Sequence, residues 1–174
     1  MNQSYQVAID GPAAAGKSTT ARLLAEILGG FYVNTGDMYR ALSWAARQNG
    51  LDPDKHTEAL AALLPGWDLH YRLLNGQDLQ LFFNGEPLSQ DKLRAPEVTA
   101  IVSQVARIPE VREWMLERQR ECSNLGVIVM EGRDIGTVIF PQARFKFFIT
   151  ASPMERARRR FAQSGEVAAG ATLE

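Results

Sequence analysis

The chain has 174 residues, of which 45% are hydrophobic and 22% are charged, as expected for a single soluble domain with a hydrophobic core of ordinary size. The formal net charge of −1 excludes a global basic surface of the kind that attracts nucleic acid or an anionic membrane. The single cysteine, Cys122, excludes an intrachain disulfide and fits a reducing cytoplasm, and the sequence shows neither a signal-peptide pattern nor an apolar run that could span a bilayer.

The first predicted elements enclose a glycine-rich loop. Tyr5–Asp10 reads as a short buried strand, and Thr20–Leu28 reads as a helix that ends at two glycines. The loop matches the phosphate-binding pattern of Gly, four residues, then Gly-Lys-Ser or Thr. Its residues are Gly11, Pro12, Ala13, Ala14, Ala15, Gly16, Lys17, Ser18 and Thr19. The alternative is a glycine-rich turn that happens to precede a lysine, but a strand, the loop and a helix together form the arrangement that the motif requires.

This loop predicts a site for a nucleoside triphosphate. Glycines let the backbone wind tightly, so that its N–H groups can point inward at phosphates. We expect Lys17 to reach the β- and γ-phosphates as a point charge, and Ser18 to offer its hydroxyl to a bound Mg²⁺. The two histidines and one cysteine of the sequence form no cluster with metal-ligand spacing.

Alternating β and α elements continue after the first helix. Phe31–Asn34 is a β-prone run, and Thr35–Asp37 is predicted to cap a helix that ends at Asn49-Gly50. A further helix is expected over Lys55–Leu64, where Pro65-Gly66 stops it.

The next section predicts a small antiparallel meander inserted into the alternating pattern. Its strands are expected over Trp67–Leu74 and Asp78–Phe83 and around Pro87-Leu88. They are joined at Asn75-Gly76 and Asn84-Gly85, the dipeptide favoured in tight hairpin turns. We interpret this insert as a lid or substrate-binding subdomain, the alternative being a structural excursion without a ligand.

Helices and buried strands return in the last third of the sequence. The predicted helices cover Ala95–Ile108 and Glu110–Ser123, and a basic helix opens at Ser152-Pro153. Nearly continuous apolar runs at Gly126–Met130 and Arg144–Thr150 predict strands that are buried on both faces. The remaining segment, Ser164–Glu174, is rich in Gly and Ala and contains no predicted strand.

Phosphoryl transfer to an anionic acceptor requires arginines besides the triphosphate loop. Arg40 and Arg133 each follow the end of a predicted strand, and ligands of parallel sheets bind beyond the carboxyl ends of the strands. The charged turn Glu131-Gly132-Arg133-Asp134 favours a functional role for Arg133 and Asp134 over a surface turn. Arg112 could equally belong to a solvated helix face.

Five segments give the sequence a resemblance to the bacterial cytidylate kinase family, a family of P-loop nucleoside monophosphate kinases. The similarity runs from near residue 5 to near residue 161, and the Gly-Arg-Asp-Ile-Gly-Thr-Val stretch makes it more specific than the phosphate loop alone. The segments are Gly11–Thr19, Asn34–Arg40, Ser103–Ala106, Pro109–Glu113 and Glu131–Pro141.

The resemblance implies a reaction and a role for each matching residue. The family transfers the γ-phosphoryl group of ATP to CMP or dCMP with Mg²⁺, and Gly11–Thr19 would hold the ATP phosphates. Arg40 and Arg133 would clamp the phosphate of the acceptor, with Thr35 nearby. Three further residues would read the cytosine edge, which offers an amino donor and carbonyl and ring acceptors. They are Ser103, Arg112 and Asp134.

The resemblance also implies an α/β fold, the three-layer P-loop sandwich with a central parallel sheet and a small antiparallel insert. The core is expected at residues 1–35 and 124–155, a CMP-binding insert at about 36–123 and the start of a lid at about 156–174. The family continues beyond the basic helix with a lid segment, a last strand and a last helix that are not present before Glu174. An unpaired sheet edge is therefore expected, and Arg156, Arg159 and Arg160 could face ATP or form a solvated basic surface.

Other readings of the sequence stay open at this point. Another P-loop kinase of a small acceptor such as UMP, AMP or shikimate is the nearest, and a nucleotide-binding module without catalysis is the next. A switch GTPase or motor ATPase is disfavoured, because the candidate strand ends in Met130-Glu131 rather than Asp and no Asn-Lys-any-Asp motif occurs. We expect a cytoplasmic monomer whose partners are ATP and CMP or dCMP, with no nucleic acid and no membrane.

Overall fold

The computed structural model describes residues 4–76 and 78–162. The chain divides into two compact units, of which the first comprises Met1–Thr35 and Cys122–Glu174 and the second Gly36–Glu121. The predicted Gly- and Ala-rich segment Ser164–Glu174 lies outside the described residues. Among the helices that are described, none is long and apolar enough to cross a membrane.

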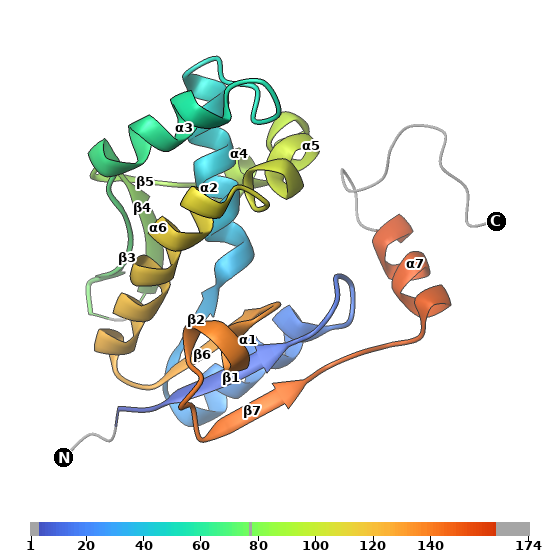
Figure 1. Ribbon diagram of the computed structural model, residues 1–174. Helices are drawn as coiled ribbons and strands as arrows, with labels where there is room; N and C mark the ends of the chain where they lie inside the picture. Colours follow the sequence, from blue (N-terminus) through green and yellow to red (C-terminus); the bar gives the residue numbers. More distant parts are fainter. Residues whose placement is uncertain (1–3, 77, 163–174) are drawn as a thin grey trace. The chain divides into compact units, whose positions relative to one another are not determined.

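The first unit contains a parallel sheet, which in the described residues has four strands in the order β2-β6-β1-β7 (Figure 1). Every pairing in it is parallel, and β1 lies between β6 and β7. The strands begin within two residues of the positions that the sequence predicts. They are β1 (Gln6–Asp10), β2 (Phe31–Asn34), β6 (Ile128–Gly132) and β7 (Phe145–Phe148).

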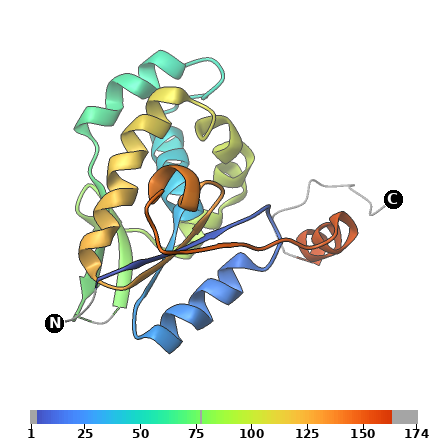
Figure 2. The same cartoon turned by 60° about the horizontal axis from the view of Figure 1, so that its bottom comes forward.

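One helix covers a face of this sheet. Figure 2 shows α1 (Lys17–Leu28) running along the strands, and its buried Ala21 and Ala25 pack with Val7, Ile9 and Val129. Small residues on α1 let the helix lie close to the β-branched surface of the strands. The unit also contains the short turns η2 (Cys122–Leu125) and η3 (Ile135–Ile139) and the basic helix α7 (Pro153–Ala162).

The predicted burial of the last parallel strand was wrong. All four residues of β7 are exposed, and Phe147 and Phe148 retain 51% and 71% of their accessible surface. In the part of the chain that is described, β7 is the edge of the sheet and pairs only with β1. An apolar run therefore identified the strand correctly, but it could not tell an edge position from a central one.

The second unit consists mainly of helices around an apolar core. Met38, Leu42, Leu60 and Met115 are fully buried there, as expected for apolar positions at helical spacing. The helices are α2 (Thr35–Gln48), α3 (Thr57–Leu63), α4 (Gln90–Arg94), α5 (Pro96–Val105) and α6 (Pro109–Glu121), with the short turn η1 (Leu64–Gly66).

The predicted meander is present in this second unit. Antiparallel strands β3 (Leu69–Leu74), β4 (Asp78–Phe83) and β5 (Glu86–Pro87) form a small sheet of their own. Asn75 and Asn84 have positive φ values of 51° and 48°, and the glycine after each is also left-handed. This is the conformation that Asn-Gly turns supply, so the sequence predicted these connections correctly.

Two details of the helices differ from the prediction. Helix α2 already begins at Thr35, so Thr35 and Gly36 are its first residues and not a cap that precedes it. Helix α4 was not predicted at all, since five residues are too few to show a period. Its N-terminus is capped by Ser89, whose hydroxyl accepts the N–H of Lys92 at 3.4 Å.

Candidate active site

The phosphate loop links the end of β1 to the start of α1, as the motif requires. Gly11 has φ of +149°, and a Cβ atom there would lie 2.0 Å from the carbonyl oxygen of Ile149. No larger residue fits at this position, because the displaced atom would be backbone and not a flexible side chain. The start of the loop therefore lies in close contact with the backbone of Ile149, directly after the neighbouring strand β7.

Lys17 is the first residue of α1, and its ammonium group turns back over the loop. Its Nζ donates to the carbonyl oxygen of Pro12 at 2.9 Å. Burial lowers the pKa of Lys17; the negative charges of Glu131 and Asp10 oppose this shift, and the positive charge of Arg133 adds to it. The cation is thus partly desolvated, and a phosphate would interact with it more strongly than in water.

Glu131 lies beside the loop, at the end of β6, and is 4% exposed. The hydroxyl of Tyr32 donates to its carboxylate, and the guanidinium of Arg22 lies 4.5 Å from the centre of the Tyr32 ring. Burial, together with the charge of Glu131 and this hydrogen bond, raises the pKa of Tyr32, while hydrogen bonding to Ser18 opposes the rise. Tyr32 therefore stays a proton donor, and its hydroxyl interacts with both Glu131 and Ser18.

Neither Glu131 nor Tyr32 was among the predicted site residues. Glu131 was noted as the residue that ends the candidate strand and as part of the charged Glu-Gly-Arg-Asp turn, but no role was assigned to it. The available signal was its position, because an acidic residue at the carboxyl end of a buried parallel strand lies at the edge where ligands bind.

Thr35 lies directly after β2, near the carboxyl end of that strand, and is the first residue of α2. Its hydroxyl donates to the carbonyl oxygen of Glu131 at 2.9 Å, and the side chain is buried. Gly132 permits this contact, since a Cβ atom there would lie 2.5 Å from Thr35 Oγ1 and 2.6 Å from Ile135 Cδ1. The ends of β2 and β6 are therefore in close contact at Gly132.

Arg133 and Asp134 form the turn that follows β6. Arg133 is exposed, and Asp134 is partly buried. The carbonyl oxygen of Asp134 accepts the N–H of Val138 at 2.9 Å and so starts the turn η3. Within the first unit, the phosphate loop, Thr35, Arg133 and Asp134 thus all lie at the carboxyl ends of the parallel strands.

The remaining predicted residues belong to the second unit. Arg40 lies on α2, and its guanidinium donates to Thr99 Oγ1 at 2.7 Å and to the carbonyl oxygen of Leu93 at 3.3 Å. Ser103 lies on α5 and Arg112 on α6, and both are exposed.

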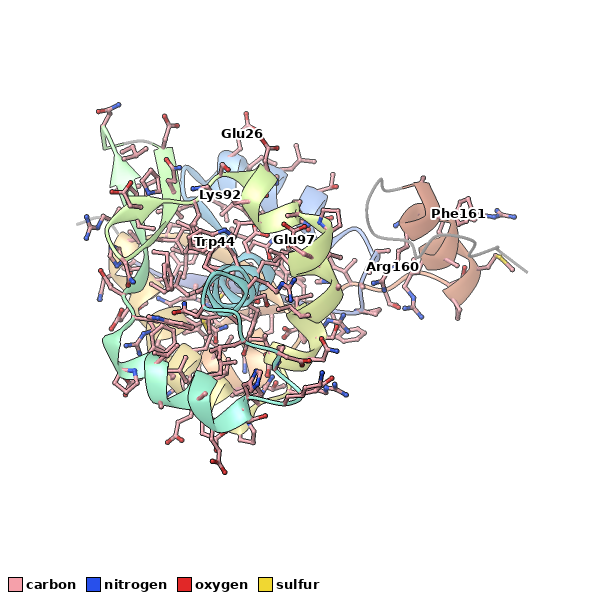
Figure 3. All side chains as sticks on the ribbon, turned by 90° about the horizontal axis from the view of Figure 1, so that it is seen from above. Glu26, Trp44, Lys92, Glu97, Arg160 and Phe161 are labelled. Carbon is pink, nitrogen blue, oxygen red and sulfur yellow. The ribbon has the colours of Figure 1, made fainter. Side chains whose placement is uncertain are left out.

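A buried ion pair on α2 was not predicted. Arg94 donates to Asp37 at 2.9 Å, and the amide of Gln90 donates to the other carboxylate oxygen at 3.1 Å. The side chain of Asp37 is 6% exposed, so the charge requires these partners. Figure 3 shows Lys92 and Trp44 of the same two helices, and the Lys92 ammonium lies 5.5 Å from the centre of the Trp44 ring. Helix α4 is thereby fixed against α2, next to Arg40.

The basic helix α7 contacts the phosphate loop through one arginine. Arg159 donates to the carbonyl oxygen of Ala15 at 3.3 Å and to the carboxylate of Glu155 at 2.7 Å. Arg156 instead donates to the carbonyl oxygen of Ala151 at 3.2 Å, and Arg160 lies exposed near the end of the helix (Figure 3). Of the three arginines considered from the sequence, Arg159 is therefore the one described in contact with the loop.

Comparison with known proteins identifies one family. The family model described as "Cytidylate kinase" matches residues 7–174. A cytidylate kinase from Pelotomaculum thermopropionicum is 47% identical over 160 residues, which cover 92% of this chain and 70% of that protein. For cytidylate kinases from Oceanobacillus iheyensis and Lactiplantibacillus plantarum the identities are 47% and 44%, over 92% and 93% of this chain and 68% and 70% of theirs. The chain thus spans roughly seven tenths of the length of these relatives.

Proposed function

The chain belongs to the cytidylate kinase family, and from this we propose the reaction of this nucleoside monophosphate kinase: the γ-phosphoryl group of ATP passes to CMP or dCMP, giving ADP and CDP or dCDP. The observation that carries the proposal is the arrangement of residues at the carboxyl ends of the parallel strands in the first unit. A triphosphate loop and the Gly-Arg-Asp turn lie there side by side, close enough for the charge of Arg133 to lower the pKa of Lys17. A phosphoryl-transfer enzyme needs cations at both the donor and the acceptor phosphate.

The phosphate loop is proposed to bind the triphosphate of ATP. Backbone N–H groups of Gly11–Thr19 would surround the phosphates, and Lys17 would leave Pro12 to bind the β- and γ-phosphates. Arg159, which already contacts Ala15, is placed to add a second positive charge at the loop.

Ser18 is the proposed protein ligand of Mg²⁺, and the surrounding donors fit such an ion. The Tyr32 hydroxyl contacts both Ser18 and the buried carboxylate of Glu131, and Mg²⁺ prefers hard oxygen ligands of this kind. No group of three or more acidic, His or Cys residues that could hold a metal occurs among the described residues, so phosphates and water would supply the other ligands. When bound, Mg²⁺ neutralises charge that develops on the transferring phosphoryl group.

The acceptor nucleotide is proposed to be bound through its phosphate and through its base. Arg40 and Arg133 would hold the CMP phosphate with Thr35 nearby, because a guanidinium fork matches phosphate oxygens in a bidentate way. Asp134 would accept the cytosine amino group, and Ser103 and Arg112 would donate to the acceptors on the base. A CMP phosphate oxygen would attack the γ-phosphorus in line, and these residues contribute by orientation and by charge.

The experiment that tests this function is ADP release from ATP and Mg²⁺ with CMP, dCMP, UMP or AMP as the acceptor. We expect CMP to stimulate release most strongly. Release that is equal for all four acceptors would favour a kinase of another small acceptor. A chain that is neither active with CMP nor stabilised by CMP against heat would contradict the proposal and leave a nucleotide-binding module.

A monomeric state and a cytoplasmic location complete the proposal. Size-exclusion chromatography with light scattering tests the first, and fractionation of cells that express the chain tests the second.

A further inference from the structure

Asp10 is the last residue of β1 and directly precedes the phosphate loop. Its side chain is 9% exposed, and each of its carboxylate oxygens accepts one backbone N–H. Ile135 donates to Oδ1 at 2.6 Å, and Gly136 donates to Oδ2 at 2.8 Å. These are the short distances of charge-assisted hydrogen bonds, and the two bonds together fix the orientation of the carboxylate.

The two donors follow Asp134 immediately in the chain. On the other side of the turn, Gly132 is paired with Asp10 in the β1–β6 ladder. The segment Arg133–Asp134 is therefore held at both of its ends by the same residue, through the sheet before it and through the carboxylate after it. At Gly136 a Cβ atom would lie 3.2 Å from Asp10 Oδ2 and 3.1 Å from Lys146 Cδ, so a larger residue there would have to displace one of these side chains by a few tenths of an ångström.

We propose that Asp10 is a positioning residue for the acceptor nucleotide: it holds the Arg133–Asp134 turn in a fixed place relative to the phosphate loop that starts at the next residue. The proposal rests on the acceptor roles of Arg133 and Asp134 given above. An aspartate suits this task better than asparagine, because two N–H donors need two acceptors and an amide offers one acceptor and one donor. The negative charge of Asp10 also favours the protonated form of Lys17.

The test compares Asp10→Asn with the wild type. The variant has the same size but leaves one buried N–H without an acceptor. We expect the KM for CMP to rise and the ratio of kcat/KM for CMP over UMP to fall, each about tenfold or more, because the Asp134 carboxylate is displaced from the cytosine amino group. The KM for ATP should change by less than about threefold. Glu26→Gln removes one charge from an exposed position on α1 (Figure 3) and is the matched control, which should leave all three values unchanged.

Several results would overturn the proposal. A fall in kcat with an unchanged CMP:UMP ratio would show that Asp10 only stabilises the fold. A raised KM for ATP with an unchanged KM for CMP would assign it to the donor site. In the variant that combines Asp10→Asn with Asp134→Asn, the effects on the CMP:UMP ratio should be less than additive, and full additivity would mean that Asp10 does not act through Asp134.

A second measurement does not depend on turnover. Hydrogen exchange of the Ile135 and Gly136 amides in the unliganded wild type should be slow, and in Asp10→Asn it should be faster at these two positions while the β1–β6 ladder stays protected. Equal exchange in the two proteins would overturn the positioning role. A wild type that is inactive with CMP but shows the expected exchange would contradict the proposed function and leave the contact intact, so the two failures are distinguishable.

Discussion

Lys17 and Arg133 carry like charges at one edge of the sheet but serve different phosphates in the proposed mechanism. Their electrostatic coupling is seen in the lowered pKa of Lys17, to which Arg133 contributes after burial. The negative charges of Glu131 and Asp10 act in the opposite direction, and the effect of Glu131 on Lys17 is larger than that of Arg133. The two cations at the carboxyl ends of the strands therefore lie with two buried carboxylates that offset their repulsion, and burial is the main cause of the lowered pKa of Lys17.

Single alanine substitutions should distinguish the proposed roles of Lys17 and Arg133. We expect Lys17→Ala to weaken ATP binding by about tenfold or more, and Arg133→Ala to reduce transfer to CMP strongly while leaving ATP affinity nearly intact. Titration calorimetry with ATP and initial rates with CMP measure the two effects. Loss of ATP binding in Arg133→Ala, or unchanged ATP affinity in Lys17→Ala, would contradict the assignments.

The lowered pKa of Lys17 predicts a pH dependence. ATP affinity should fall by about ten- to a hundredfold as the pH rises from neutral towards the ordinary lysine value of 10.5, because the ammonium group that is proposed to bind phosphate loses its proton below that value. The free energy of unfolding of the unliganded protein should rise over the same pH range, since the unfolded chain binds the proton of Lys17 more tightly than the folded chain does. Lys17→Arg is the control, because a guanidinium does not titrate there. The same fall in ATP affinity in Lys17→Arg would mean that another group titrates.

Contacts between helices position Arg40 in the second unit. The end of α4 supplies the Leu93 carbonyl, α5 supplies the Thr99 hydroxyl, and the Asp37–Arg94 pair holds α4 against α2. The long Arg40 side chain is thereby ordered, which would reduce the entropy lost when it binds the phosphate that is proposed for it.

Thr99→Val should disturb Arg40 without changing the shape of the site. Loss of one hydrogen bond to a charged group predicts an increase of about three- to tenfold in the KM for CMP, with the KM for ATP unchanged. Steady-state kinetics with either substrate varied measures this. Thr99→Ser keeps the hydroxyl and should behave like the wild type; if the serine variant shows the same defect as valine, the hydrogen bond is not the cause.

The junction of β6 with the following turn depends on Gly132. In Gly132→Ala the added methyl group would meet Thr35 and Ile135, so we expect a loss of about 1–3 kcal/mol in the free energy of unfolding and a raised KM for CMP. Gly66→Ala adds the same atom where nothing lies within 4 Å and is the control. Urea unfolding measures both variants, and equal stabilities would show that the junction can relax around the methyl group.

At the scale of the whole molecule, the exposed edge strand β7 is the surface at which we expect copies of the proposed monomer to associate in concentrated solution. Phe147 and Phe148 are large, exposed and apolar, and in the described chain the outer side of β7 has no strand partner. Such an edge favours pairing with another chain.

Phe148→Ser should therefore lower the scattering of concentrated solutions and leave the melting temperature nearly unchanged, because little packing is lost. Val129→Ala, at a fully buried position of the same sheet, should lower the melting temperature without reducing association. Light scattering and thermal unfolding measure the two properties. If Phe148→Ser associates as strongly as the wild type, the edge is not the cause.

The sequence by itself determined the local elements and the family. The phosphate loop, the Asn-Gly hairpin turns and the helices with a clear period were all predicted, because each is encoded by residues a few positions apart. The family followed from motifs of the same local kind, and Arg133 and Asp134 were selected because they follow a buried strand.

Only the tertiary structure decided which distant residues meet. Asp10 contacts residues 125 and 126 positions away, and Tyr32 contacts Glu131 across 99 positions. These contacts depend on the strand order β2-β6-β1-β7, which no local pattern encodes. The exposure of β7 was missed for the same reason, because burial of a strand depends on its neighbours in the sheet and not on its own residues.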